Sequence, residues 1–348
     1  MNSQDITRAI IDTTVEHTMK EMDADPHRSV RKLCDLGKQF SKGRFQNEIF
    51  TLMQDLLRND NSPYYKAIDT LLKNNDHKTL RHIGINIGYN SFTYGAKILR
   101  AKEKETGYNI PWTVSLRIND QISRGAGPSL LAYIAEKGME KGIFTYLLYS
   151  EDNLEQFDQY LNLIHRFRDC AFVWFLPDLP LTDEQCKLIS SCSNLMLSFP
   201  AESEHLPANA AAMQHYKSLY SIHYLYDEDD VHLWEKDPDF FHFSMYGSVF
   251  LFLLADEDCP PSMRSTIAKA VYQYRLTPQY PVFPLEIFED ICRIDRIIST
   301  EPSYLEVFPD RSVRTIDGSI YQRSNFSSLD DFCAAVLPKV GYEEKREP

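Results

Sequence analysis

The sequence lacks the clustered cysteines that hold most cysteine-bound metal centres. It has no CxxC and no CxxxCxxC motif, and its seven cysteines are scattered along the chain. The closest pair, Cys186 and Cys192, has a spacing that fits no common metal site. Scattered cysteines in a large chain without an export signal are typical of free, mostly buried thiols in a reducing compartment. We therefore expect no cysteine-bound cofactor.

Long apolar runs and an excess of positive charge are also missing. No run approaches the roughly 18 residues that indicate a membrane span. The first residues, MNSQD, lack the basic and apolar regions of a signal peptide, so we expect a cytoplasmic protein. Lys and Arg number 37 and Asp and Glu 50, giving a formal net charge of −13. This charge argues against nucleic acid or an anionic membrane as partner and permits a basic peptide.

The chain changes its hydrophobic period near residue 110. Its 348 residues suit one large domain with appendages, or two domains. Before residue 110 the apolar residues recur at helical spacing, as at Ile6, Ile10 and Val15, and Ser62-Pro63 marks the start of a helix. The run at 83–95 is an exception, since it reads as a strand-like apolar segment between glycines. The first 110 residues are thus predicted to form a largely helical region.

After Pro111, short apolar strands alternate with helices. Strands are predicted at residues 113–118, 143–149, 171–176, 194–199, 219–226 and 249–254. Their starts are roughly 23 to 30 residues apart, which is one βα unit each. The pattern predicts an α/β fold with a partial (β/α)6 TIM-like barrel at 111–278, with a doubly wound sheet as the alternative. A helix at 285–299, a hairpin at 304–316 and a last helix predict a small α/β appendage at 279–348.

Several phrases of this chain resemble the radical S-adenosylmethionine (SAM) enzymes, in particular those with a SPASM-type C-terminal region. The phrase GINIGYNS at 84–91 resembles the "NLGYN" phrase that precedes the first barrel strand in that family. KGI at 141–143 resembles the phrase before its second strand, and DCAF at 169–172 resembles its third-strand phrase. The resemblance spans roughly residues 25–330 and implies a partial barrel with an N-terminal helical region.

The chain departs from this family where the family does its chemistry. The loop that should carry three cluster-binding cysteines reads LRINDQISRGAG at 116–127. An iron–sulfur cluster needs thiolates, and this loop has none. The "GGEP" turn falls on YSED at 149–152, where only Glu151 is kept, and the C-terminal hairpin FPDRSVR at 308–314 has no cysteine. The resemblance therefore implies a degenerate relative without a cluster, without an intact SAM-binding turn and without catalytic residues.

Carboxylates follow the predicted strands. In a βα barrel all strand ends open on one face, where sites of such folds are built, and a ring of carboxylates there would attract a cation or a basic peptide. The competing interpretation is that each carboxylate caps the helix that follows its strand. The candidate ligand-binding residues are Asp120, Glu151, Asp178, Asp227, Asp230 and Asp256.

This region also contains candidate metal ligands and a set of large aromatic side chains. His223, Asp227, Asp230 and His232 offer nitrogen and oxygen ligands for a divalent metal, but a solvated acidic loop is the favoured interpretation, because His223 and Asp227 lie within or at the end of one strand and need not converge. Large aromatics at strand positions that could face inward would fill the space used by cofactors in active relatives, or simply form the core. They are Trp112, Tyr146, Trp174, Phe199, Tyr224 and Phe252.

Two functions are compatible with these patterns. The first is a catalytically degenerate radical SAM-like protein that binds a protein or peptide partner, and the family resemblance implies peptide modification as its context. The alternative is an enzyme with repurposed, metal-assisted chemistry at the acidic mouth of the barrel. Bound metal, measured by elemental analysis, distinguishes the two.

Overall fold

The computed structural model describes residues 3–22, 24–40, 44–123, 126–152, 155–230 and 241–341. The first part of the chain is helical, as predicted. Its helices are α1 (Ser3–Met22), α2 (Pro26–Phe40), α3 (Arg44–Leu56), α4 (Pro63–Asn74), α5 (His77–Ile85), η1 (Asn86–Gly95) and α6 (Ala96–Thr106). Among the described residues, no helix combines the length and the apolar character needed to cross a bilayer.

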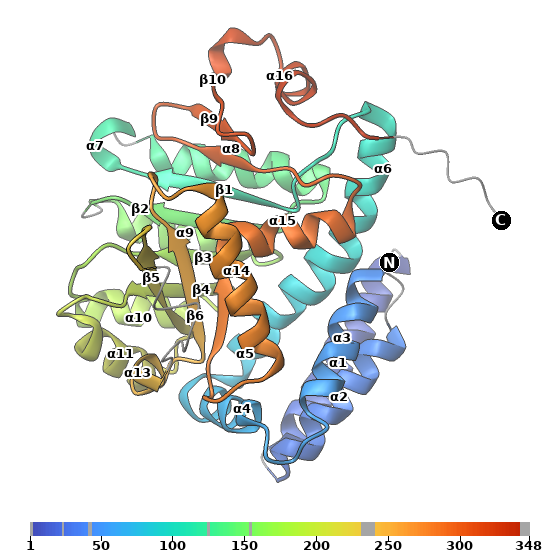
Figure 1. Cartoon of the computed structure of the whole chain (residues 1–348), viewed down its shortest axis with the longest axis vertical. Helices are drawn as coiled ribbons and strands as arrows, with labels where there is room; N and C mark the ends of the chain where they lie inside the picture. Colours follow the sequence, from blue (N-terminus) through green and yellow to red (C-terminus); the bar gives the residue numbers. More distant parts are fainter. Residues whose placement is uncertain are drawn as a thin grey trace.

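The helices α1, α2 and α3 form a small bundle beside the sheet, and α4 lies at its lower end (Figure 1). They share a buried cluster of their own that includes Met19, Val30, Leu57 and Tyr65. The start of α4 is the one predicted from the sequence, because the Ser62 side chain accepts a hydrogen bond from the Tyr64 amide and Pro63 takes the first helical position. This cap fixes where the bundle turns towards the sheet.

The strand-like expectation for residues 83–95 is wrong, because this segment continues α5 as the wider helical turns of η1. Its polar side chains explain why it is helical. Buried Asn86 donates to the carbonyl oxygens of Arg168 and Cys170, and Asn90 donates to that of Asp169. The GINIGYNS phrase therefore has a structural role: it satisfies the carbonyl groups that precede the third strand.

All six predicted strands are confirmed, within one or two residues at each end. They are β1 (Thr113–Ile118), β2 (Thr145–Ser150), β3 (Ala171–Phe175), β4 (Leu195–Pro200), β5 (Tyr220–Tyr226) and β6 (Phe250–Ala255). The sequence analysis missed β7 (Phe283–Glu286), a short edge strand that contains Pro284 and pairs with β6. The helix expected at 285–299 is α15 (Ile287–Ile298), which begins only after this strand.

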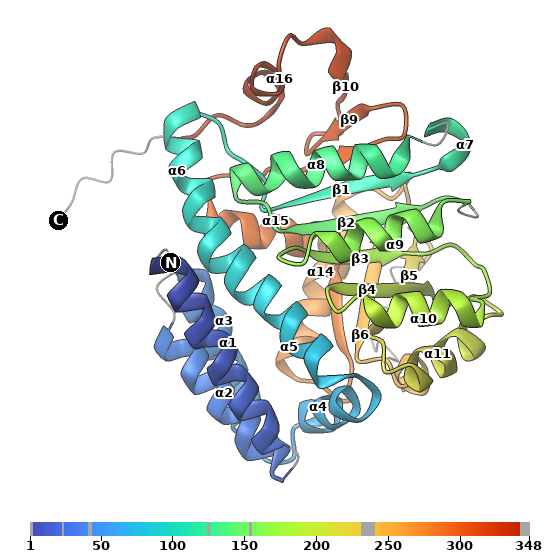
Figure 2. The ribbon, with the colours of Figure 1, turned by 180° about the vertical axis from the view of Figure 1, so that it is seen from behind.

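The strands from β1 to β7 pair in parallel and in chain order. A doubly wound sheet reverses its strand order at a switch point, so this order rules out that alternative. The other helices are α7 (Asp120–Ser123), α8 (Gly127–Lys141), α9 (Phe157–Arg166), α10 (Asp183–Ser191), α11 (Leu206–His215), α13 (Phe241–Ser244) and α14 (Pro261–Leu276). Figure 2 shows α8, α9, α10 and α11 lying along one face of the sheet.

The hairpin predicted near residue 308 joins the same sheet at its other end. Its strands β8 (Leu305–Val307) and β9 (Ser312–Thr315) are followed by β10 (Ile320–Gln322), η2 (Arg323–Asn325) and α16 (Leu329–Val336). β8 pairs in parallel with β1, so the sheet has ten strands in the order β10-β9-β8-β1-β2-β3-β4-β5-β6-β7. Segments after residue 279 thus add to both ends of the sheet. The expected division at residues 110 and 278 stays a prediction.

The sheet is curved, and the face away from α8–α11 is the inner one. Trp174 packs against Phe157 and Tyr160 of α9, so Phe175, the next residue of β3, points to the opposite face. There its ring centroid lies 5.7 Å from that of Phe252 in β6. Strands three positions apart in a flat sheet are separated by about 14 Å. The inner face is therefore concave.

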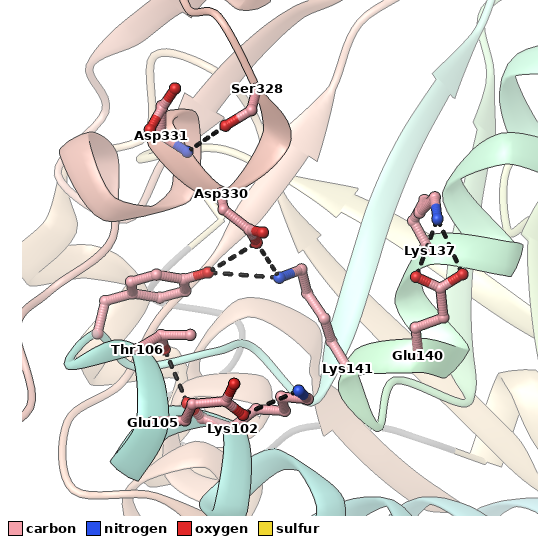
Figure 3. Close-up of polar contacts among 10 residues, drawn as sticks. Lys102, Glu105, Thr106, Lys137, Glu140, Lys141, Ser328, Asp330 and Asp331 are labelled. Carbon is pink, nitrogen blue, oxygen red and sulfur yellow. Dashed lines mark hydrogen bonds and ion pairs between the residues drawn. The ribbon is translucent and has the colours of Figure 1, made fainter.

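The C-terminal segment from α16 to residue 340 is held by a polar cluster, shown in Figure 3, and by main-chain hydrogen bonds to residues 107–109. The Lys141 ammonium at the end of α8 lies 2.6 Å from the Asp330 carboxylate of α16, and the buried Tyr108 hydroxyl lies 3.3 Å from both groups. The amide of Asn109 donates to the Pro338 carbonyl at 2.7 Å. These contacts seat α16 beside α6 and α8.

Candidate functional site

The polar side chains of β1 lie on the concave face of the sheet. Along this strand Thr113, Ser115 and Arg117 alternate with three buried apolar residues. Alternate residues of a strand point to opposite faces, so the apolar set packs under the helices and the polar set faces inward. Arg117 comes last, at the carboxyl end of the strand, where ligand sites of parallel α/β folds lie.

Arg117 takes part in a charged cluster with β8 and β9. Its Nε donates to Oε1 of Glu306 at 2.6 Å, and Nη1 of Arg314 lies 3.2 Å from Oε2 of the same carboxylate. The Glu306 side chain is only 4% exposed, whereas those of Arg117 and Arg314 are 26% and 27% exposed. The Glu306 carboxylate raises the pKa of Arg117 against the opposing effect of burial. One buried anion thus holds two partly accessible cations on the concave face.

An aromatic row continues from this cluster across the sheet. The Arg117 guanidinium lies over the Tyr149 ring, 5.2 Å from its centroid, and Tyr149 stacks on Phe175 at 4.6 Å. Phe175 then meets the edges of His223 and Phe252. Burial lowers the pKa of His223 to about 3, so this imidazole is neutral at physiological pH. Its Nδ1 pairs with the Ser198 hydroxyl at 3.1 Å.

Only some of the aromatic side chains that the sequence predicts to face inward do so. Phe252 lies on the concave face, as predicted. Tyr146 and Trp174 do not: the Tyr146 hydroxyl donates to the carbonyl of Ala135 in α8, and Trp174 packs on α9. The residues that take the inward places are Tyr149, three positions after Tyr146, and Phe175, next to Trp174. A shift of one position along a strand reverses the face, and an all-apolar strand gives no sequence signal for it.

Near β1 and β2, the predicted carboxylates make local contacts. Buried Asp120 accepts hydrogen bonds from the Gln156 amide at 3.1 Å and from the Tyr160 hydroxyl at 3.5 Å, next to the start of α9. Exposed Glu151 accepts one from the Asn119 side chain at 3.3 Å. Asp120 thus supports the start of α9, the helix after β2, whereas the capping interpretation placed it on the helix after its own strand. Glu151 stays exposed.

The remaining candidates lie in loops after β3, β5 and β6. Asp178 accepts a hydrogen bond from the Ser203 hydroxyl. Asp227 accepts one from the Asp229 amide, while Asp230 accepts from the Asp227 amide and the Tyr224 hydroxyl. Asp256 accepts from the amide of Glu257. Asp227, Asp230 and Asp256 thus support their own loops, whereas Asp178 joins the loop after β3 to the loop after β4. Their role as one ligand-binding mouth remains a proposal.

The predicted metal ligands are not seen together. His223 points to the aromatic row, and Asp227 and Asp230 are engaged in their loop. His232 lies outside the described residues. Within the ranges that the structure describes, no group of three or more His, Cys, Asp or Glu side chains is placed to hold a metal ion.

The residues at the end of β1 do not fit an iron–sulfur cluster. All seven cysteines are buried, free thiols spread over different elements, as the sequence predicted. Burial raises the pKa of Cys34 to about 12 and that of Cys192 to about 11, which disfavours the thiolate that binds iron. A hollow of about 170 Å³ lies near the end of β1 and offers no sulfur ligand. Its lining residues are Ile122, Ala126, Leu130, Pro309, Asp310 and Arg311.

A buried carboxylate lies at the end of β7. Glu286 accepts hydrogen bonds from the Tyr226 hydroxyl at 2.8 Å and from the Glu289 amide at 2.6 Å. Burial raises its pKa from the ordinary 4.5 to about 7. The contact joins the carboxyl ends of β5 and β7 and caps α15, on the face of the sheet opposite His223 and Phe252.

Sequence reasoning missed the Arg117–Glu306–Arg314 cluster. The available signal was the alternation of polar and apolar residues in β1, which places Arg117 on the face opposite Leu116 and Ile118. A lone arginine at such a position needs an anionic partner or solvent. Its partner Glu306 lies 189 positions later in the chain, and only the pairing of β8 with β1 identifies it.

Comparison with known proteins gives similarities of structure alone. No protein-family model matches the chain, and no curated protein matches it either. SuiB from Streptococcus suis, bound to the precursor peptide SuiA, is 7% identical with a TM-score of 0.45 over 63% of each chain. SuiB bound to S-adenosylmethionine is also 7% identical, with a TM-score of 0.44 over 63% of this chain and 62% of SuiB.

A third similar structure is a 3-dehydroquinate dehydratase from Geobacillus kaustophilus. It is 12% identical, with a TM-score of 0.38 over 58% of this chain and 84% of the dehydratase. In the two SuiB complexes the chain spans less than two thirds of SuiB. At these identities the similarities concern the fold, and they assign neither an activity nor a ligand to this chain.

Proposed function

We propose that this chain is a catalytically degenerate radical SAM-like protein, built on a partial (β/α)6 barrel, that acts as a binding or accessory partner of a peptide. The proposal rests on the hydrogen bonds made by the residues at the carboxyl end of β1. Where the family keeps its cluster loop, Asn119 and Asp120 are engaged in hydrogen bonds to Ile122, Gln156 and Tyr160. Because these hydrogen bonds hold the loop in its present conformation, an iron–sulfur cluster could bind there only if the loop were rebuilt.

The residues at the carboxyl end of β2 support the same proposal. Tyr149 occupies the turn that would approach the SAM amino group, and its ring is sandwiched between Arg117 and Phe175. Small residues allow such close backbone approach, and a stacked tyrosine does not. Ser150 is also engaged, since its hydroxyl accepts a hydrogen bond from Trp174 Nε1 at 2.8 Å.

The proposed partner is a basic peptide that meets the loops after β5 and β6. Asp227, Glu228 and Asp229 are exposed at the end of β5, and Asp256 is exposed at the end of β6. The neighbouring Leu225 side chain is 58% exposed on the concave side of the sheet. Carboxylates around an exposed leucine suit a peptide with basic and apolar residues.

The peptide part of the proposal can be tested with two labelled probes. A repeat of Lys and Leu should bind more tightly than a repeat of Glu and Leu, measured by fluorescence anisotropy, and its affinity should fall as salt rises. The Asp227→Asn/Asp230→Asn variant should weaken binding while keeping the side-chain acceptors of the loop. The Asp55→Asn/Asp60→Asn variant is the matched control, because it removes the same charge from exposed positions in the helical bundle. Equal binding of the two probes would contradict the proposal.

The non-catalytic part is tested separately. Anaerobic incubation with iron and sulfide should leave the protein without the visible absorption of thiolate-bound iron. Calorimetry with SAM should show no heat of binding. A stoichiometric cluster lost on cysteine substitution, or micromolar SAM binding lost in Glu151→Ala, would show that the ancestral site survives.

A further inference from the structure

The cluster on the concave face pairs two partly exposed guanidinium groups with one buried carboxylate. Glu306 uses both carboxylate oxygens, one for Arg117 and one for Arg314. Two guanidinium groups thus share one carboxylate within a protein whose net charge is −13. Cations held together in a partly desolvated site favour a further anion.

Arg117 has hydrogen-bond donors to offer such an anion. Only its Nε is engaged, and none of the described residues accepts a hydrogen bond from Nη1 or Nη2. The side chain keeps 26% of its surface exposed. Its plane is fixed by Glu306 on one edge and by the Tyr149 ring, so the free edge is already oriented for a planar, two-oxygen acceptor.

Arg314 is oriented in the same way and already touches a second carboxylate. Its guanidinium lies over the Phe308 ring, 4.9 Å from the centroid. Its Nη2 lies 3.5 Å from Oε1 of Glu257, whose side chain is 64% exposed. An ion pair this long and exposed is weak. Glu257 belongs to the loop after β6, so it reaches Arg314 across the open side of the concave face.

We propose that Arg117 and Arg314 form a binding site for the carboxylate group of a ligand on the concave face, and that Glu257 occupies part of this site until the ligand displaces it. The class follows from the chain itself, because Glu257 already places a carboxylate against Arg314. The aromatic row beside the site is itself packed, with Phe175 and Phe252 only 3% and 6% exposed, so recognition at this site rests on the carboxylate group.

This inference goes beyond the proposed function, since it concerns a small anionic group and not a basic peptide. The two involve different residues: Arg117 and Arg314 here, the loops after β5 and β6 there. Their tests use different probes. Failure of either one leaves the other standing.

The test is benzoate binding to the full-length chain at constant ionic strength, measured by saturation-transfer NMR, with acetate as competitor. Wild type should bind benzoate, and acetate should displace it. Arg117→Gln should weaken binding roughly ten- to hundredfold, the effect of losing a charge-assisted hydrogen-bonded pair. Arg117→Lys keeps the charge but not the fork, so it should bind between the two. Glu257→Gln should bind more tightly than wild type, because the competing carboxylate is gone.

The controls separate the site from general charge and from misfolding. Arg58→Gln removes one positive charge from an exposed position far along the chain and should bind like wild type. If Arg117→Gln unfolds, Arg117→Gln/Glu306→Gln replaces the ion pair by two amides and allows the same measurement. Equal benzoate affinity in wild type, Arg117→Gln and Arg58→Gln would overturn the proposal. Displacement by inorganic phosphate and not by acetate would overturn the carboxylate assignment.

Discussion

Arg117 of β1 and Glu306 of β8 form a 2.6 Å ion pair between the first and the last parallel strand of the sheet. The pair ties the C-terminal hairpin to the strand that begins the βα series. It also holds Arg314 through the second carboxylate oxygen. Stability and the concave charged cluster therefore depend on the same carboxylate.

Loss of Glu306 should destabilise the fold. Glu306→Ala leaves two arginines without their buried counter-charge, and we expect a loss of about 2–3 kcal/mol in the free energy of unfolding. Glu257→Ala removes the exposed partner of Arg314 and should change stability by at most about 1 kcal/mol. Urea unfolding followed by circular dichroism measures both. Equal losses in the two variants would show that the cluster does not hold the hairpin.

Two buried carboxyl groups should make the protein less stable as pH rises. Burial raises the pKa of Glu286 from 4.5 to about 7 and that of Asp295 from 3.8 to about 8. The folded state keeps these protons while the unfolded chain releases them, so their contribution is full below pH 4 and is lost between about pH 4 and 8. For Glu286 the change is on the order of 3 kcal/mol.

The measurement compares urea unfolding of wild type and Glu286→Gln from pH 5 to 8.5. The glutamine keeps an acceptor for the Tyr226 hydroxyl and cannot titrate, so the difference between the two proteins isolates this group. The variant should lose less stability than wild type across this range. Parallel curves would mean that Glu286 titrates normally.

Gly142 should be the least replaceable glycine of the βα units. It ends α8 with a φ of +95°, and a Cβ there would lie 2.5 Å from the Gly95 carbonyl oxygen. We expect Gly142→Ala to cost about 2–4 kcal/mol, from left-handed strain plus the clash with the backbone of η1. Gly107 separates the two effects, because it has a φ of +78° with open space around it.

Gly107→Ala should accordingly cost only about 1–2 kcal/mol. Thermal unfolding of both variants gives the comparison. If the two substitutions cost the same, the close approach of Gly95 and Gly142 contributes nothing. This contact explains why the KGI phrase carries a glycine where helix α8 meets η1.

Asn109 should hold the C-terminal segment more strongly than the Lys141–Asp330 ion pair does. Asn109 is fully buried, and its side chain donates to the carbonyls of Pro338 and Lys339 and accepts from Ser299 and Thr300. Asn109→Leu should raise hydrogen exchange in residues 329–340 by an order of magnitude or more, since about 2 kcal/mol of buried hydrogen bonding is lost. Asp330→Asn, at a 73% exposed position, should leave exchange nearly unchanged.

The order of the secondary structure was determined locally and could be predicted. The six apolar strands, the helices between them and the Ser62-Pro63 start all rest on neighbouring residues, and all are confirmed. The segment at 83–95 was misread because its asparagines find their acceptors before β3, some 80 residues later. The four-residue β7 was missed because Pro284 weakens its strand pattern and because, among the described strands, it pairs with β6 alone.

The sequence by itself determined an α/β chain with scattered thiols, no cluster loop and an acidic balance. Only the tertiary structure decided which residues share the concave face. Curvature brings Phe175 to Phe252, and strand pairing brings Glu306 to Arg117. The physical reason is that local sequence sets periodicity and capping, whereas charge pairing between distant strands depends on sheet order and on which face each side chain takes.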